Sequence, residues 1–356
     1  MRRYQIGIFT GILISLGQFA HADSPPHSEG QPISSEITPL ASSRVHNWAE
    51  FFVTADFIYW QARQDGLSFA QEGNYRFNNN VPQSAHKGSF KNVDFGFEPG
   101  FKAGIGVDFR HDGWSLLANY TWLDQFDARG SARNNPDQRG QLGSGFFTDI
   151  LPNTLVSPVP LESARARWKL RFNVIDVELA RSFYISSHLV LKPYIGAKYA
   201  WIDQKYRVNY VGTGTNPFDF TMIMRQKQDF WGVGLRAGLN SEWHFTRNWS
   251  LYGALALSEL YSQFETTRKD VETSGATPGV IYYVENNFHT IKPVLEMAFG
   301  VRYETFFSND RYQLFFQAGW EEQFWFDHNQ LIDNGFRYGR GDLTLQGLDI
   351  KAGFSF

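Results

Sequence analysis

Charged and apolar residues alternate along several segments of this chain, and the charged ones carry the chemistry that a function could use. Between residues 99 and 110, Lys102 and Asp108 alternate with Phe101 and Val107. Successive side chains of a strand point to opposite faces, so such a segment has one charged and one apolar face. Charges of both signs on one face can line an aqueous lumen and pair across it. The residues predicted to line such a lumen are Lys102, Asp108, Arg110, Lys198, Arg236, Glu242, Glu296, Arg302, Glu304 and Lys351.

Histidines offer a rival chemistry to that of a charged lumen. If the strands close into a barrel, histidines at the strand ends could carry out hydrolysis there. Such a site needs a histidine beside a carboxylate or a serine, outside the membrane. The candidates near predicted strand ends are His111, His188, His244, His289 and the pair Asp327-His328. The sequence has no serine-centred elbow, and lone histidines at an interface are usually amphipathic anchors. We therefore expect no catalytic residue, no cofactor and no metal site.

The last nine residues show the alternation most clearly. One face would carry Leu348, Ile350, Ala352, Phe354 and Phe356, and the other Asp349, Lys351, Gly353 and Ser355. A membrane-spanning strand shows this pattern when one face meets lipid and the other water, although an edge strand of a soluble β protein could show it too. A Lys or Arg facing lipid at the midplane costs ~2–4 kcal/mol, so the charged faces must point inward.

About ten such segments follow one another, with short and long connections in alternation. The segments cover about residues 50–63, 99–110, 114–122, 166–182, 189–204, 231–243, 249–257, 295–304, 312–320 and 342–356. Short turns fall at 111–113, 186–188, 246–248 and 308–310, and long connections at 64–96, 128–165, 206–228, 268–288 and 327–341. The sequence therefore predicts an all-β fold, a transmembrane antiparallel up-and-down β-barrel with short periplasmic turns and long extracellular loops.

Two details of this fold stay open. Parts of the first two long connections could add a strand pair, so twelve strands are the alternative to ten. The alternation also slips between residues 173 and 175, which we interpret as a β-bulge.

The N-terminal residues predict export. Arg2 and Arg3 precede an apolar run that ends in Ala20-His21-Ala22, the pattern of a secretory signal peptide. We expect residues 1–22 to be the signal peptide, cleaved near Ala22. Residues 23–48, rich in Pro, Ser and Glu, would form a flexible periplasmic lead-in. Residues 49–356 would form the barrel.

Composition excludes several classes of protein. The chain has no Cys, so disulfides, thiolate metal sites and a cysteine nucleophile are impossible. Aromatic residues make up 17% of the 356 residues, as expected where aromatic girdles meet both bilayer interfaces. A net charge of −3 disfavours nucleic acid as a partner, because binding it needs a basic surface.

Several short motifs match a known family. They are Phe52-Val53-Thr54-Ala55-Asp56-Phe57-Ile58-Tyr59-Trp60, Pro99-Gly100-Phe101-Lys102-Ala103-Gly104, His111-Asp112-Gly113-Trp114, Trp168-Lys169-Leu170, and Asp176-Val177-Glu178-Leu179-Ala180-Arg181-Ser182-Phe183-Tyr184 with Pro193-Tyr194-Ile195-Gly196. They resemble the Legionella-type major outer-membrane protein family, whose pore-forming relatives include the MOMP-like proteins of environmental chlamydiae. The resemblance implies a porin or porin-like surface barrel in the bacterial outer membrane. Chlamydial major proteins resemble cysteine-crosslinked envelope components, and a chain without Cys cannot form such a coat.

The final aromatic residue also resembles the C-terminal signature of outer-membrane barrels. We expect Phe354 and Phe356 to form the signal that the barrel-assembly machinery recognises. The other expected partners are outer-membrane lipid or lipopolysaccharide, small hydrophilic solutes and a second copy of the chain.

The predicted function is narrow, weakly selective, passive diffusion of small hydrophilic solutes. About ten strands fall between barrels packed with side chains and wide porins of 16–18 strands. A structural or adhesive barrel with a filled lumen is the main alternative, and an outer-membrane hydrolase is a weaker one.

Overall fold

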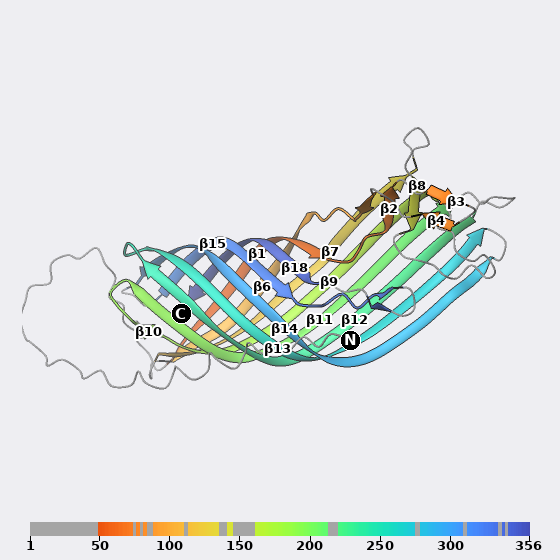
Figure 1. The fold of residues 1–356 in the computed structure, drawn as a ribbon. Coiled ribbons are helices and arrows are strands. Elements are labelled where there is room, and N and C mark those ends of the chain that lie inside the picture. The colour runs from red at the N-terminus through yellow and green to blue at the C-terminus, as the bar shows by residue number, and fades with distance from the viewer. Residues whose placement is uncertain are drawn as a thin grey trace, which may run out of the picture. The chain divides into compact units, whose positions relative to one another are not determined.

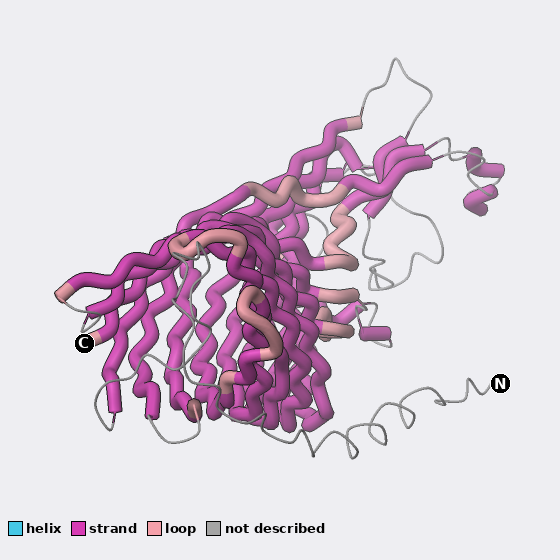
Figure 2. The backbone as a smooth tube through the Cα atoms, turned by 90° about the vertical axis from the view of Figure 1, so that its left-hand side faces the viewer, coloured by secondary structure: helices cyan, strands magenta, loops and turns pink. Residues whose placement is uncertain are grey.

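The chain folds as strands throughout its described part (Figure 1). The structure, a computed structural model, describes residues 49–73, 76–78, 81–83, 88–109, 113–134, 141–144, 161–212, 220–274, 278–308, 312–333, 337–338 and 341–356. The predicted signal peptide and lead-in, residues 1–48, lie outside these residues. No helix capable of crossing a membrane occurs in the described part of the chain, which Figure 2 shows as strands and loops.

Ten of the described strands form one closed antiparallel ring. They are β1 (Ala49–Gln64), β6 (Phe97–Phe109), β7 (Trp114–Arg133), β9 (Leu161–Arg181), β11 (Leu189–Gly212), β12 (Phe220–His244), β13 (Trp249–Ser274), β14 (Gly279–Phe307), β15 (Tyr312–Trp325) and β18 (Leu343–Ser355). The ring closes because β18 pairs with β1, from Phe52 opposite Ser355 to Gln64 opposite Leu343. Closure satisfies the backbone hydrogen bonds of both edge strands, which a bilayer requires. The barrel and its ten strands are confirmed.

The remaining strands are short and belong to the connections. They are β2 (Ala70–Gly73), β3 (Arg76–Asn78), β4 (Val81–Gln83), β5 (Gly88–Lys91), β8 (Gln141–Ser144), β10 (Phe183–Tyr184), β16 (Ile332–Asp333) and β17 (Arg337–Tyr338). In the first two long connections, β2 pairs with both β5 and β8. The added strand pairing expected in those connections is therefore a small extension of the sheet, too short to cross a membrane.

Two girdles of aromatic side chains mark the membrane-spanning part of the wall. At the short-turn end, Phe354 stacks with Phe307 and Phe356 on the outer surface. On β12 the girdles are represented by Trp243 and Trp231. The twelve residue-to-residue steps from Trp231 to Trp243 span ~40 Å at ~3.3 Å per step, which is ~30 Å across a membrane for strands tilted by ~40°. This matches the ~30 Å hydrocarbon core of a bilayer.

The alternation of the strands reverses its sense beyond the upper girdle. On β9, Ile175, Val177 and Leu179 are exposed while Asp176 is buried. Between residues 165 and 171 of the same strand the exposed residues are basic, and the buried ones, Trp168 among them, are apolar. Each strand thus faces lipid with apolar side chains in the membrane, and water with polar side chains above it.

This reversal explains two errors of the sequence prediction. Strand β9 pairs with β11 without interruption from Ala180 to Ser163, so the bulge predicted at residues 173–175 is wrong. The slip marks the change of polarity, and the register shift of this region lies on β7, between Leu123 and Phe126. Connections predicted at 206–228 and 268–288 are largely strand, because their polar residues face water from the outer wall.

The position of the lipid belt can be tested with arginine substitutions on the outer surface. Leu235 on β12 is 78% exposed and lies between the two girdles. Leu235→Arg should lower the free energy of unfolding by ~2–4 kcal/mol, measured by urea titration in phospholipid vesicles. Asn287→Arg is the control, because Asn287 lies on the outer surface above the girdle, opposite Glu265. A similar loss in both variants would contradict the assigned belt.

Candidate functional site

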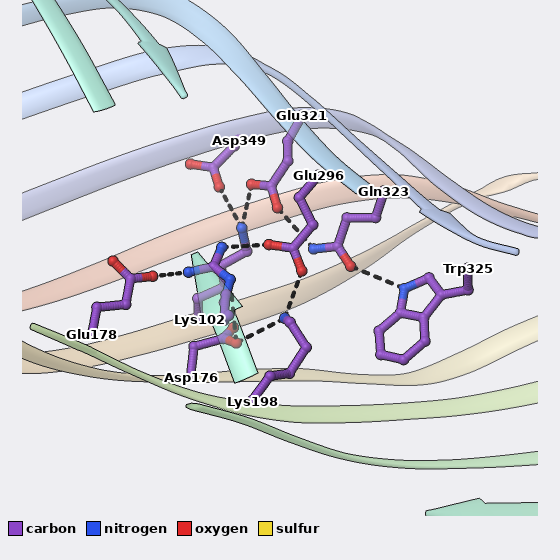
Figure 3. A network of polar contacts seen from close by, with 10 residues as sticks. Lys102, Asp176, Glu178, Lys198, Glu296, Glu321, Gln323, Trp325 and Asp349 are labelled. Atoms are coloured by element: carbon purple, nitrogen blue, oxygen red, sulfur yellow. Dashed lines mark hydrogen bonds and ion pairs between the residues drawn. The ribbon is translucent and has the colours of Figure 1, made fainter. Parts of the chain in front are cut away.

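A layer of paired charges crosses the lumen within the membrane-spanning part, at and below the level of the upper girdle. It comprises Asp56, Lys102, Asp176, Glu178, Lys198, Arg236, Glu296, Glu321, Asp349 and Lys351, and is called the charged layer below. Figure 3 shows Lys198 between Asp176 and Glu296, with Nζ 2.7 and 2.6 Å from their carboxylate oxygens. Arg236 from β12 joins Glu296 on β14 to Glu178 on β9. Lys198 and Asp176 are cross-strand partners on neighbouring strands, whereas the contacts of Glu296 with Lys198 and Arg236, and of Arg236 with Glu178, link strands that are not neighbours in the ring.

A second group of ion pairs completes the layer on the other side of the lumen. Lys102 on β6 contacts Glu321 on β15 and lies 3.1 Å from the Asp349 carboxylate on β18. Lys351 lies 3.1 Å from the carboxylate of buried Asp56. Because each cation contacts at least one carboxylate, the layer compensates the high cost of removing charges from water.

Apolar side chains fill the lumen directly above the charges. This apolar layer comprises Ile58, Trp60, Leu123, Trp168, Phe172, Ile202, Phe230, Leu260, Phe264, Val294, Trp325 and Leu345, all buried. The rings of Phe172 and Trp325 meet edge to face, with centroids 5.5 Å apart. Their strands, β9 and β15, are opposite in the ring, with four strands between them on either side. The two walls therefore touch at this level.

Two long connections fold into the lumen and hold the apolar layer in place. Tyr206 and Tyr210 on β11 donate hydrogen bonds to the carbonyl oxygens of Leu67 and Phe69, at 2.9 and 2.8 Å. The connection after β15 is held in the same way, because Gln228 donates to the carbonyl of His328 at 2.9 Å. Polar groups of the inward backbone are thus satisfied by the wall.

Hydrogen bonds link tryptophans of the apolar layer to polar side chains of the wall and, at one place, to the charged layer. Trp168 donates to Gln204, and Gln204 donates to Gln64 on β1, both at 3.0 Å. In Figure 3, Trp325 donates to Gln323, whose amide reaches Glu321 of the charged layer. The layers therefore form one connected structure inside the wall.

Below the charged layer lies an open cavity of about 430 Å³, called the vestibule here. Arg302 donates to Glu242 at 3.1 Å, and Lys192 lies 3.9 Å from Asp108. The chain comes close to itself on this wall, because a Cβ added to Gly106 would lie 2.2 Å from the ring of Phe52. The vestibule is a polar space of the size of a small solute.

Nine of the ten residues predicted to line a lumen lie in the charged layer or in the vestibule, and Lys102, Arg236, Glu296 and Lys351 belong to both because the layer forms the roof of the vestibule. Lys102, Lys198, Arg236, Glu296 and Lys351 belong to the charged layer. Asp108, Glu242, Arg302 and Glu304 line the vestibule, and Arg110 lies outside the described residues. Phe354 and Phe356 face outward at the short-turn end, where Phe51 and Phe356 exchange backbone hydrogen bonds of 3.1 and 2.8 Å.

The list of predicted lumen-lining residues omitted the carboxylates that neutralise these cations, although Asp349 was placed on the polar face with Lys351, and the prediction missed the whole apolar layer. Asp56, Asp176, Glu178, Glu321 and Asp349 follow the same alternation and could have been found by extending each polar face. The apolar layer could not be found in this way. Trp168 and Phe172 lie in phase with Asp176, but their apolar character suggests the opposite face.

Comparison with known families identifies the chain. Residues 45–356 match the family model of the Legionella pneumophila major outer membrane protein precursor. The chain belongs to this family. It is therefore a bacterial outer-membrane protein, as the resemblance predicted. A comparison with curated protein sequences found no significant match.

Solved outer-membrane barrels are similar to this chain only in fold, and weakly. The outer membrane protease OmpT from Escherichia coli shares 12% identity at a TM-score of 0.43, over 86% of this chain and 96% of that one. A major outer membrane protein from Thermus thermophilus shares 11% at 0.26, over 87% and 100%. A FadL homologue from Pseudomonas aeruginosa shares 8% at 0.27, over 88% and 91%.

The described histidines lie apart from one another in this family member. His328 is fully buried in the apolar layer against Phe230, Phe264 and Trp325, and neither ring nitrogen has a hydrogen-bond partner among the described residues. His289 stacks on Tyr261 at the outer surface. The His188 Nδ1 forms a hydrogen bond with the Ser187 hydroxyl in a turn. The His244 Nε2 lies 3.8 Å from a carboxylate oxygen of Glu242 in the vestibule. His111 lies outside the described residues.

The charged layer can be tested by removing one cation. Lys198→Met leaves Asp176 and Glu296 without the ammonium that neutralises them, so we expect the free energy of unfolding to fall by ~3–5 kcal/mol. Lys205→Met on the same strand is the control, because Lys205 is exposed and its loss should change the value by less than ~0.5 kcal/mol. Urea unfolding in vesicles measures both. Equal stability of wild type and Lys198→Met would show that the pairs are dispensable.

The buried His328 predicts a stability that depends on pH. Burial, aided by the nearby Lys292, holds the pKa of His328 well below its usual value. Below about pH 6.5 the unfolded chain binds a proton that the folded chain excludes, so stability decreases as the pH falls. Between pH 7.5 and 5.0 the loss from this residue should be about 2 kcal/mol.

Urea unfolding at both pH values tests this, with His328→Phe expected to remove the loss while keeping the ring contacts. His289→Phe at the outer surface should retain the wild-type dependence. The same pH slope in wild type and His328→Phe would exclude His328 as its source.

Proposed function

We propose that this protein acts as a closed outer-membrane barrel, a structural surface protein whose wall anchors its extracellular connections. The contact of Phe172 with Trp325 carries this proposal. A hydrated ion needs a path several ångströms wide, and the buried apolar side chains around this contact fill the lumen at that level. The filled-lumen alternative is therefore favoured over the open diffusion pathway that the sequence first suggested.

The inward connections support the same function. Leu67, Phe69, His328 and Leu331 are buried in the lumen rather than lying across the rim. Arg268 on β13 donates to the carbonyl of Ile332 at 3.2 Å and pairs with buried Asp270. The connections after β1 and after β15 are thus anchored to the wall inside the lumen. Such anchoring suits a protein that presents loops at the cell surface.

Narrow, weakly selective diffusion of small hydrophilic solutes is the second candidate. The vestibule favours this candidate, because a polar cavity of about 430 Å³ with paired charges could hold a small solute on the periplasmic side of the two layers. Conduction would then need a second conformation in which both layers part. The hydrolase alternative gains no support, because no described histidine lies within hydrogen-bonding distance of both a carboxylate and a serine.

Single-channel recording from refolded protein in planar bilayers separates the two functions. The closed barrel predicts no conductance steps in 1 M KCl at up to about 150 mV of either sign, together with native strand content by circular dichroism. Regular steps in the folded protein would refute the closed barrel and favour gated diffusion.

A crosslink then tests whether any steps pass through the lumen. The chain has no Cys, so Gln228→Cys with Gln330→Cys introduces a unique pair at a site where the backbone N–H of Gln330 donates to the side-chain oxygen of Gln228 at 2.8 Å. Disulfide formation is verified by gel mobility without reductant. Steps that vanish on oxidation and return on reduction would establish a path beside the connection after β15, whereas steps unaffected by oxidation would exclude that path.

A further inference from the structure

Basic side chains form two continuous rows on the outer wall above the upper girdle. In the first row Lys169, Lys205 and Lys227 are direct cross-strand partners on β9, β11 and β12. The second row crosses five strands and comprises Arg129, Arg167, Arg207, Arg225 and Lys269. We call these eight residues the basic face. Seven of them are exposed, and Lys269 is half-buried.

Like charges placed directly opposite each other in a sheet repel, so this arrangement needs negative charge from elsewhere. Asp127 supplies part of it, because Arg129 and Arg167 donate to its carboxylate at 2.9 and 2.6 Å. These arginines hold the pKa of Asp127 well below its usual value. Lys169, Lys205 and Arg225 have no ion-pair partner within the described part of the chain. Asp127 is the cross-strand partner of Lys169 on β7, and Asp203 lies near Lys205, so the centre of the basic face is only partly compensated.

A row of carboxylates lies between the basic face and the girdle and fixes where an anion can bind. Asp203, Asp229 and Glu265 are cross-strand partners one level below the lysines. Lys227 pairs with Asp229, and Arg171 with Asp124. These acids repel an anion from the level of the girdle. The favourable position for a phosphate is therefore higher, over Lys169 and Lys205.

The wall beneath the basic face suits the chains of a lipid. Trp201 and Trp231 are cross-strand partners in the upper girdle, and below them Ile195 and Leu235 are 66% and 78% exposed. Apolar wall, aromatic girdle and basic rows therefore follow one another on the same strands. The long connections lie at this end, so these rows face the outer leaflet.

We propose that the basic face binds the phosphate groups of the phosphorylated glycolipid of the outer leaflet, lipopolysaccharide. The acyl chains lie against the apolar wall of β9, β11 and β12, and the phosphates lie over the lysine row. A bound phosphate replaces the repulsion between neighbouring cations by attraction, and charge-assisted contacts to Lys and Arg are the stronger kind of hydrogen bond. This binding is independent of whether the lumen conducts.

The test uses the double variant Lys169→Gln/Lys205→Gln in the full-length refolded protein. Both residues are exposed and without ion pairs among the described residues, so their replacement should leave the unfolding transition unchanged. Arg63→Gln/Arg247→Gln is the matched control, because it removes two exposed cations outside the basic face. Native mass spectrometry in a neutral detergent measures binding of hexa-acylated lipid A with two phosphates, of the same lipid A after dephosphorylation, and of inorganic phosphate.

We expect the lysine variant to bind the phosphorylated lipid about 25-fold more weakly than wild type, since each of the two basic residues near an anionic surface contributes about a five-fold effect. The control variant should bind like wild type, and dephosphorylated lipid A should bind wild type as weakly as the phosphorylated form binds the lysine variant. Unchanged affinity in the lysine variant, or equal affinity for dephosphorylated lipid A, would overturn the proposal. Displacement of the lipid by an equal concentration of inorganic phosphate would assign the face to free phosphate instead.

Discussion

Each strand of this barrel meets two different solvents along its length, and the arrangement of the interior follows from that constraint. Between the girdles the outer surface meets hydrocarbon, so Ile175 and Leu235 face outward and every charge must face inward. Above the upper girdle the outer surface meets water, so basic residues face outward and Trp168 and Phe172 face inward. The side-chain period of two is kept throughout. Only the assignment of the apolar face changes.

The charged layer lies where these two regimes meet. A ten-strand lumen is too narrow to hydrate inward charges as a wide porin does, so they must be neutralised by one another. The adjoining aromatic rings add to this stabilisation, because the Lys102 ammonium lies 4.7 Å from the Trp60 ring centre, and Lys198 lies 5.9 Å from that of Trp325. The apolar layer thus also covers the charges that the membrane forces inward.

Much of the fold could be predicted because the lipid-facing strands repeat one simple pattern. Strand number, antiparallel order and the alternation of short and long connections all follow from where apolar alternation begins and ends. The interior above the girdle could not be predicted in this way. The slip in the alternation near Asn173 can mean either a β-bulge or a change in the solvent that the outer surface meets. The periodicity of a single strand does not distinguish these two causes. Cross-lumen partners such as Lys198 and Glu296 depend on how ten strands close, and that register is not encoded in any one strand.

The same constraint limits how the lumen could open. If the apolar layer were made by the inward connections alone, their departure would clear a path, as a lid does. Phe172 and Trp325, however, both belong to strands of the wall, and their contact would persist after the connections left. Separating them requires either new side-chain rotamers, which the surrounding packing opposes, or a wider ring, which would break the continuous hydrogen bonds between neighbouring strands. A barrel built in this way resists opening at its wall, so its closure is a property of the strands themselves.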